Sequence, residues 1–131
     1  MASPKAKIAL IEDDIAIVQM YSMKFEAEGF DVVYANDGEQ GLEVIKDFKP
    51  DLVLLDLMMP IMGGAEMLEK MRQEDWGKDI KVIVLTNMGE SEAPENLKDL
   101  NVESFIVKAD LTPKQVAEKV LETLGIEKEE E

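Results

Sequence analysis

Five short, mainly apolar runs divide the chain, and each is followed by residues that favour a turn. They cover residues 7–11, residues 30–35, the run between Pro50 and Asp56, residues 80–85 and residues 103–107. Apolar runs of this length between turn signals are typical of strands that are buried on both faces of a sheet. We therefore predict five strands, with the run before Asp56 at the centre of the fold.

Helical spacing of apolar residues fills the segments between these runs. The predicted helices cover residues 15–28, residues 38–47, a segment that starts after Gly64 and fades near residue 75, residues 93–100 and residues 113–124. Asp14 and Thr112 are predicted N-caps, and Gly29 and Gly125 are predicted helix ends. The fourth helix is the least regular, because Pro94 fits only a first helical turn.

Alternating strands and helices predict a parallel sheet with helices on both faces, which is an α/β doubly wound fold. We expect Ile15, at the start of the first helix, to face the core. The 131 residues are 46% apolar and 33% charged, as in an ordinary globular domain. We expect one domain over residues 1–131, with a frayed leader at about residues 1–6 and an acidic tail at residues 127–131.

Four of the five predicted strands end in a polar side chain that can take part in chemistry. Glu12 and Asp13 follow the first strand, Asp56 the third, Thr86 the fourth and Lys108 the fifth. Parallel strands place their carboxyl ends at one edge of a sheet, where open α/β folds hold their ligands. Each residue alone is more typical of a cap, a turn or a solvated surface. Together they predict a site with three carboxylates, a hydroxyl and an ammonium group.

The three carboxylates favour a hard divalent cation, because like charges at one edge repel one another and a bound cation resolves the repulsion. The chain contains no His and no Cys, which argues against a zinc site and excludes thiol chemistry. We therefore expect Mg²⁺, or Mn²⁺, bound through oxygen ligands.

The formal net charge of −15 argues against direct binding to nucleic acid or to an anionic membrane, because affinity for phosphate groups comes from lysine and arginine. The charge favours basic partner surfaces. No apolar run approaches the roughly 18 residues of a membrane helix, and no signal-peptide pattern is visible. We expect a cytoplasmic protein with no membrane partner.

Four pieces of the sequence resemble the motifs of one family. They are residues 10–14, residues 54–60, residues 84–87 and residues 105–108. In this order and at this spacing they resemble the receiver domain of two-component response regulators, in its stand-alone, CheY-like form, over essentially the whole chain. The resemblance implies a flavodoxin-like fold with strand order 2-1-3-4-5 and five flanking helices.

The resemblance also implies a phosphorylation site. Asp56 is expected to accept a phosphoryl group from a sensor histidine kinase or a phosphotransfer protein. Asp13 and Asp56 are expected to hold Mg²⁺ through their side chains, Met58 through its backbone carbonyl and Glu12 through water.

The resemblance implies that three further residues respond to the phosphoryl group. Thr86 and Lys108 are expected to contact its oxygens, and Phe105 stands where the family has a switching aromatic side chain. The surface of the fourth helix, fifth strand and fifth helix would then change shape and control binding to a downstream protein, or form a homodimer. The chain would be a signalling switch and not a classical enzyme.

The chain departs from the family pattern at two places. Ala109 follows Lys108, where the family usually has a proline with a cis peptide bond, which leaves the reach of Lys108 open. Residues 100–102 lack the usual glycine turn, which leaves the fourth helix and its dimer-forming face open.

Two methionines flank the expected approach of water to the phosphoryl group. Met58 and Met88 stand two residues after Asp56 and Thr86. Neither side chain can orient water as a carboxylate or an amide can, so we expect slow self-dephosphorylation.

Two other functions fit part of the pattern. A receiver-like scaffold would never be phosphorylated, but the complete acidic site argues against it. A phosphatase of the haloacid dehalogenase type also uses a strand-end aspartate, yet its second acid would stand where this chain has Met58. Nucleotide-binding glycine patterns are absent after the first strand. We expect no output domain, unless the chain is cut from a longer regulator.

Overall fold

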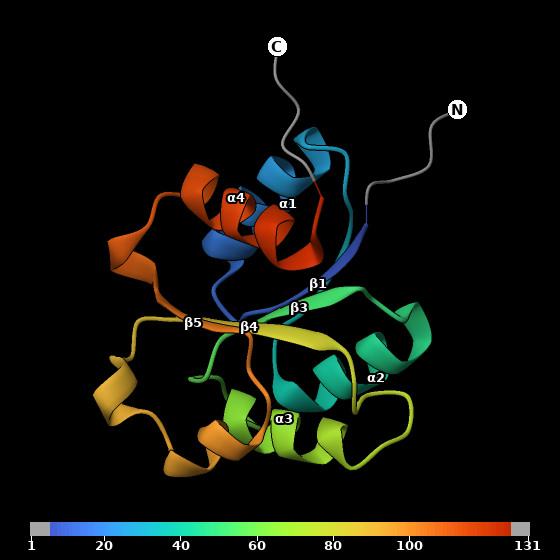
Figure 1. The fold of residues 1–131 in the computed structure, drawn as a ribbon, viewed down its shortest axis with the longest axis vertical. Coiled ribbons are helices and arrows are strands. Elements are labelled where there is room, and N and C mark those ends of the chain that lie inside the picture. Colours follow the sequence, from blue (N-terminus) through green and yellow to red (C-terminus); the bar gives the residue numbers. More distant parts are fainter. Residues whose placement is uncertain (1–5, 127–131) are drawn as a thin grey trace.

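The structure is a computed structural model that describes residues 6–126. A single sheet crosses the molecule, with helices on both faces (Figure 1). Its parallel strands are β1 (Lys7–Ile11), β2 (Asp31–Ala35), β3 (Leu52–Leu55), β4 (Lys81–Thr86) and β5 (Ser104–Val107). Their order, β2-β1-β3-β4-β5, confirms the predicted doubly wound, flavodoxin-like sheet.

Helices form two layers over the sheet (Figure 1). Helices α1 (Ile15–Ala27) and α4 (Pro113–Leu124) cover one face, and α2 (Gly38–Phe48) and α3 (Gly64–Arg72) cover the other. The helix predicted last along the chain is therefore α4. No helix within residues 6–126 has both the length and the apolar character needed to cross a membrane.

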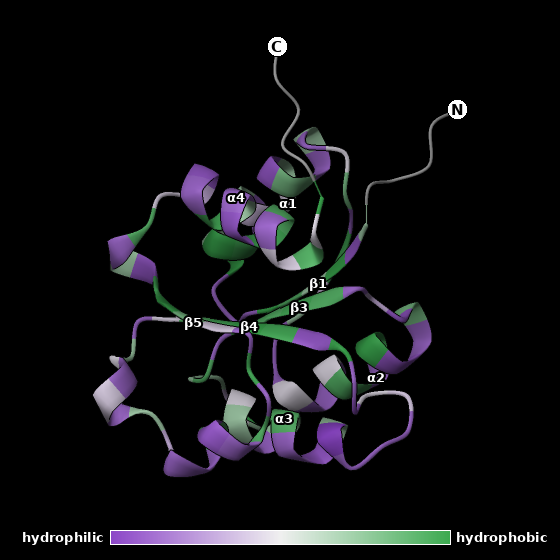
Figure 2. Ribbon diagram, viewed as in Figure 1, coloured by the Kyte–Doolittle hydropathy of each residue, from purple (hydrophilic) through white to green (hydrophobic). Residues whose placement is uncertain are grey.

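The core has two apolar layers that the sheet separates. Successive side chains of a strand point to opposite faces, so Leu10 of β1 and Leu54 of β3 lie under α1 and α4, whereas Ile11 and Leu55 lie under α2 and α3. All four are at most 1% exposed. Figure 2 shows the resulting apolar strands between helices that are largely hydrophilic on the outside.

The predicted helix ends are confirmed where the structure describes them. Asp14 caps α1, because its side chain accepts hydrogen bonds from the backbone N–H groups of Ala16 and Ile17 at 3.0 and 3.3 Å. Thr112 caps α4 in a reciprocal arrangement with Gln115. Gly125 ends α4 with a φ of 71°, a conformation that favours glycine.

The predicted fourth helix does not form as an α-helix. Two short 3₁₀ helices, η1 (Glu90–Glu92) and η2 (Glu95–Asp99), stand in its place, so residues 6–126 contain four α-helices and not the expected five. Pro94 separates the two and cannot donate a backbone hydrogen bond. Leu97 is the only buried residue of η1 and η2. One apolar anchor is too little to stabilise a short helix by packing.

Two smaller predictions are corrected. Ile15 is 55% exposed, since it opens the first turn of α1, while Val18, Tyr21 and Phe25 of the same helix face the core. Ala6, expected to be part of a frayed leader, is buried, and its carbonyl accepts a hydrogen bond from the backbone N–H of Asp31 at 3.0 Å. The rest of that leader, residues 1–5, and the expected acidic tail lie outside the described residues.

Arg72, at the end of α3, connects the loop before β4 to the loop before β5 through hydrogen bonds. Its guanidinium donates hydrogen bonds to the backbone carbonyls of Gly77 and Ile80 before β4, at 2.9 and 2.7 Å. It also donates to the carbonyls of Leu100 and Asn101 before β5, at 2.8 and 3.1 Å. The sequence offers no local signal for this residue, because its partners come from two separate loops.

Candidate functional site

The predicted site residues meet at the carboxyl edge of the sheet. Ile11 of β1 is paired with Leu55 of β3, and Leu55 is paired with Val84 of β4, so the strands end nearly level. Thr86 is the last residue of β4 and is paired with Val107, which stands directly before Lys108. The parallel register therefore brings together residues that lie far apart in the sequence.

Asp56 lies at the centre of this edge and is only 6% exposed. Its backbone N–H donates to the carbonyl of Ile11 at 3.0 Å, which continues the β1–β3 ladder by one residue. One carboxylate oxygen accepts a hydrogen bond from the backbone N–H of Met58 at 3.3 Å, and the other lies 3.4 Å from Nζ of Lys108. These two contacts fix the position of the Asp56 carboxylate. They also keep the ammonium group of Lys108 beside it, and a buried charge needs such a partner.

The loop after Asp56 is folded back tightly. The backbone N–H of Gly64 donates to the carbonyl of Leu57 at 3.1 Å. A Cβ atom on Gly64 would lie 2.2 Å from the carbonyl oxygen of Asp56, so only glycine fits here. The start of α3 is thereby fixed against the end of β3.

Glu12 is 2% exposed and is the most deeply buried carboxylate of the site. One of its oxygens accepts a hydrogen bond from the backbone N–H of Asp14 at 3.1 Å, and the other forms an ion pair with Lys108. Burial raises the pKa of Glu12 from 4.5 to about 7; the charge of Asp56 adds to this increase, and the contacts with Lys108 and Asp14 oppose it.

Lys108 joins Glu12 and Asp56 from the opposite side of the site. Its side chain is 11% exposed. Burial would lower the pKa of Lys108, but the contacts with Glu12 and Asp56 outweigh burial and raise the pKa above 10.5. Within residues 6–126 all peptide bonds are trans, and the chain continues from Lys108 into a 3₁₀ turn, η3 (Lys108–Asp110). Ala109 in place of proline therefore does not prevent Lys108 from reaching the carboxylates.

Asp13 completes a cluster that can hold a cation. One carboxylate oxygen from each of Glu12, Asp13 and Asp56 lies within 4.8 Å of the other two. Asp13 is exposed, whereas the other two are buried. Carboxylate oxygens are the ligands that Mg²⁺ prefers, and Mg²⁺ commonly keeps several waters. The donor set and its one open side fit such an ion.

Thr86 and Phe105 stand on the strands β4 and β5, whose carboxyl ends reach the same edge of the sheet. Thr86 is fully buried, and its hydroxyl accepts a hydrogen bond from the backbone N–H of Met88 at 3.3 Å. Phe105 is half-buried and packs with the apolar layer on the α2–α3 side of the sheet. The register pairs Phe105 with Val84, two residues before Thr86. Thr86 and Phe105 are thus carried by the two paired strands β4 and β5, with Thr86 nearer their carboxyl ends.

Sequence reasoning missed the second role of Asp14 and a role of Asn36. Asp14 was predicted as a helix cap, which it is, but its backbone N–H also holds Glu12. The side chain of Asn36, from the loop after β2, donates to the backbone carbonyl of Glu12 at 3.3 Å. The Asn36-Asp37-Gly38 turn was visible in the sequence, but its contact with Glu12 depends on the β1–β2 register.

Comparison with known proteins decides the family. A family model described as the response regulator receiver domain matches residues 8–121. The chain belongs to this family. Receiver domains are generally signalling switches that interact with histidine kinases, and they bind Mg²⁺ in an acidic pocket of the kind that Glu12, Asp13 and Asp56 form here. The family match removes the haloacid dehalogenase alternative.

Curated relatives of this receiver domain are longer proteins. The probable transcriptional regulator ycf27 of Porphyridium aerugineum is 32% identical over 120 residues, which are 92% of this chain and 48% of the relative. The DNA-binding response regulator MtrA of Mycobacterium tuberculosis is 33% identical over 86 residues, which are 66% of this chain and 36% of the relative. The chain spans about half the length, or less, of the curated relatives it matches.

Solved receiver domains share the whole fold. A CheY-like receiver domain protein from Methanospirillum hungatei is 28% identical, with a TM-score of 0.81 and 95% of each chain covered. The N-terminal domain of a response regulator receiver protein from Methanoculleus marisnigri is 32% identical, with a TM-score of 0.71, covering 94% of this chain and 99% of that one.

Proposed function

We propose that Asp56 accepts a phosphoryl group from a sensor histidine kinase or a phosphotransfer protein, and that the modified domain controls binding to a downstream protein. The observation that carries the proposal is the meeting of Asp56 with Lys108 and with the carboxylates of Glu12 and Asp13. A nucleophile, a fixed cation and a cation-binding cluster are what in-line phosphoryl transfer needs, because positioning and neutralisation of charge dominate this chemistry.

The phosphoryl group passes directly from the donor to a carboxylate oxygen of Asp56. A carboxylate oxygen of Asp56 forms a bond to phosphorus while the bond from phosphorus to the donor's imidazole nitrogen breaks, and the imidazole leaves with that electron pair. Mg²⁺, held by the side chains of Asp13 and Asp56, the backbone carbonyl of Met58 and Glu12 through water, would supply neutralisation of the phosphoryl oxygens. Lys108 gives up its contact with Asp56 and pairs with a phosphoryl oxygen.

Thr86 and Phe105 carry the change away from the site in this proposal. Phosphorylation gives Asp56 close to two negative charges and new acceptor oxygens. The hydroxyl of Thr86 donates to one of these oxygens and moves toward Asp56, which leaves space beside the β4–β5 pair for Phe105 to rotate inward. The surface of residues 88–102, β5 and α4, which corresponds to the fourth helix, fifth strand and fifth helix of the expectation, then changes shape.

Partners and location follow from the same proposal. The chain acts in the cytoplasm, where histidine kinases draw on ATP, and its direct output is contact with a protein and not with nucleic acid. The net charge of −15 supports that choice. A homodimer through the surface of residues 88–102, β5 and α4 stays a prediction.

Phosphorylation by a small donor tests the proposal. Wild-type protein is incubated with acetyl phosphate, with Mg²⁺ or with EDTA, and its intact mass is measured. We expect a single phosphoryl adduct that requires Mg²⁺ and is absent in Asp56→Asn. Asp47→Asn, on the exposed side of α2, is the matched control and keeps the adduct. Wild-type protein that stays unmodified with Mg²⁺, or Asp56→Asn that is still modified, would contradict the proposal.

A further inference from the structure

Strand β5 leaves one edge of the sheet without a neighbouring strand, since it is the last in the order β2-β1-β3-β4-β5. Apart from the ladder with β4, no backbone hydrogen bond of residues 104–106 is found within residues 6–126, whereas Val107 is the N-cap of the 3₁₀ turn η3. In a parallel strand the backbone groups of alternate residues point to the outer side. Unpaired N–H and C=O groups of this kind are a template for another extended chain.

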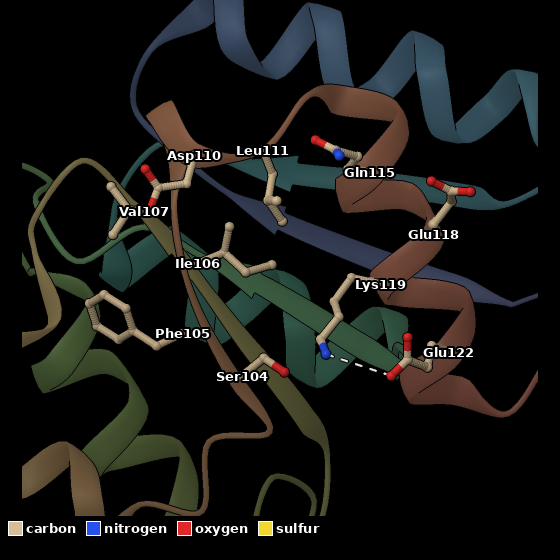
Figure 3. A pocket seen from close by; sticks show the side chains of 10 residues that line it. All are labelled: Ser104, Phe105, Ile106, Val107, Asp110, Leu111, Gln115, Glu118, Lys119 and Glu122. Atoms are coloured by element: carbon tan, nitrogen blue, oxygen red, sulfur yellow. Dashed lines mark ion pairs between the residues drawn. The ribbon is translucent and has the colours of Figure 1, made fainter.

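Grooves on both sides of β5 leave this edge accessible. A groove of about 610 Å³ lies between β5 and α4, and a groove of about 700 Å³ lies between β5 and residues 90–102. Ser104 and Phe105 line both. In Figure 3, Ile106 and Leu111 lie on the α4 side of β5, and Phe105 points away from them. The second groove is lined by η1 and η2, the two short helices that replace the predicted α-helix.

The two grooves combine apolar side chains with an acidic rim. Apolar side chains that line the grooves are the half-buried Val102, Phe105 and Leu111 and the buried Leu97 and Ile106. Six carboxylates and two lysines also line the grooves; the carboxylates are Glu90, Glu95, Glu103, Asp110, Glu118 and Glu122. One of the lysines, Lys119, already lies 3.6 Å from Glu122. The rim therefore has an excess of negative charge.

We propose that a partner's extended segment, rich in both basic and apolar residues, adds to the outer edge of β5 as a further strand. Backbone hydrogen bonds to β5 would give the affinity, and side chains on the two faces of the added strand would enter the two grooves. Apolar side chains cover Phe105 and Leu111, and lysine or arginine side chains reach the acidic rim. This names the partner class of the output surface and so rests on the proposed function.

Charge selects this occupant over a second copy of the chain, and so argues against the homodimer that the resemblance allowed at this surface. A second copy on the same edge would bring the acidic rim against itself, and both molecules carry a net charge of −15. Like charges across an interface are costly, whereas complementary charge speeds association and fixes the partner. A basic segment removes the repulsion that a copy would increase.

Binding of designed peptides tests the inference. The probe is a fluorescent peptide with a repeating Val-Val-Lys-Lys pattern, which presents both residue types on each face of a strand. Its affinity for the full chain is measured by fluorescence anisotropy, with and without acetyl phosphate and Mg²⁺. We expect saturable binding that weakens about tenfold when alternate peptide nitrogens are methylated, because the methylated strand loses backbone hydrogen bonds. We expect no binding when Glu replaces every Lys.

Matched charge variants locate the peptide. Glu90→Lys with Glu95→Lys on the rim should weaken binding about tenfold, whereas Glu26→Lys with Asp47→Lys, on α1 and α2, changes the net charge equally and should leave binding unchanged. Equal binding of the methylated and unmethylated peptides would overturn the strand addition, and equal binding to both double variants would overturn its location. Self-association of the chain that protects the β5 amides from hydrogen exchange would make a second copy the occupant and overturn the inference.

Intact mass of the same samples separates this inference from the proposed function. A phosphorylated chain that fails to bind the peptide overturns the inference alone. A chain that binds the peptide as expected but forms no phosphoryl adduct supports the surface and contradicts the proposed function.

Discussion

At the scale of single residues, the positive charge of Lys108 offsets the repulsion between the carboxylates of Glu12 and Asp56. Glu12 and Asp56 are both buried, and each contacts the ammonium group of Lys108. The remaining cost of burial shows in the pKa of Glu12, which rises to about 7. The carboxylate of Glu12 is therefore close enough to protonation for pH to matter near neutrality.

The stability of the metal-free chain should fall as pH rises through this range. The pKa of Glu12 is about 7 in the folded chain and 4.5 as a reference for the unfolded chain, so the folded chain binds more protons between these values. Stabilisation by the protonated form is complete below pH 4.5 and is lost as pH passes 7. The free energy of unfolding should drop by on the order of 2–3 kcal/mol across the interval.

Urea unfolding in EDTA between pH 5 and pH 8 measures this effect. Glu12→Gln should lack this part of the pH dependence, whereas Glu43→Gln, at an exposed position of α2, should follow the wild type. Parallel curves for wild type and Glu12→Gln would show that Glu12 is not the titrating group.

We expect single residues to set the lifetime of the proposed phosphorylated state as well. Met88 is half-buried beside Thr86, and Met58 is 60% exposed at the mouth of the site. Because neither thioether orients water, Met88→Glu should accelerate loss of the phosphoryl group by on the order of tenfold, measured by intact mass after removal of acetyl phosphate. Met88→Leu is the control and should stay slow. Equal rates for the two variants would count against the prediction.

The strand-end residues could be predicted because a parallel sheet leaves little choice. Once Asp56 and Thr86 end neighbouring strands, the register brings them together whatever their rotamers. The ion pair of Glu12 with Lys108 could not be predicted, because it joins residues 96 positions apart through two long side chains. The ion pair depends on the path of the loop after β5. The sequence left that path open, because Ala109 stands where the family usually has a proline.

At the scale of elements, local signals decided helices only where packing agreed with them. Asp14, Thr112 and Gly125 cap helices that also bury an apolar face, and these helices form as predicted. Residues 93–100 carry a proline at a permitted position, yet they bury little more than Leu97. Helical spacing on so few apolar residues could not outweigh the entropy of ordering the segment.

Arg72 fixes the turn that leads into β5 through its hydrogen bonds to the carbonyls of Leu100 and Asn101. Arg72→Ala should lower the free energy of unfolding by about 1–3 kcal/mol, because carbonyls before β4 and β5, most of them partly buried, lose a charged donor. It should also increase hydrogen exchange at the start of β5 more than in β1. Denaturant unfolding and amide exchange by mass spectrometry provide the two measurements.

The control for this prediction is Lys70→Ala, at an exposed position in the same turn of α3. It should change stability by no more than about 0.5 kcal/mol. If Arg72→Ala behaves like Lys70→Ala, the carbonyl contacts of Arg72 contribute no net stability.

At the scale of the whole molecule, alternation of strands and helices was sufficient to predict the architecture. Buried runs such as Leu52–Leu55 serve both core layers at once, so their continuous apolar character reveals a sheet covered on two sides. Accessible surfaces were harder to foresee. The groove between β5 and residues 90–102 borders two short 3₁₀ helices that stand where an α-helix was expected. Pro94 made that helix the least regular of the predicted five, but the sequence did not show that a groove would result.

The uneven depth of the three carboxylates also has a consequence for ions in solution. Asp13 stands exposed at the opening, and Glu12 and Asp56 lie behind it, so an arriving cation meets one charge in water and two in a drier interior. An ion can exchange its hydration shell stepwise along this path. With only three carboxylates and one open side, we expect the cluster to suit small ions that retain part of their water better than large ions that require a full set of protein ligands.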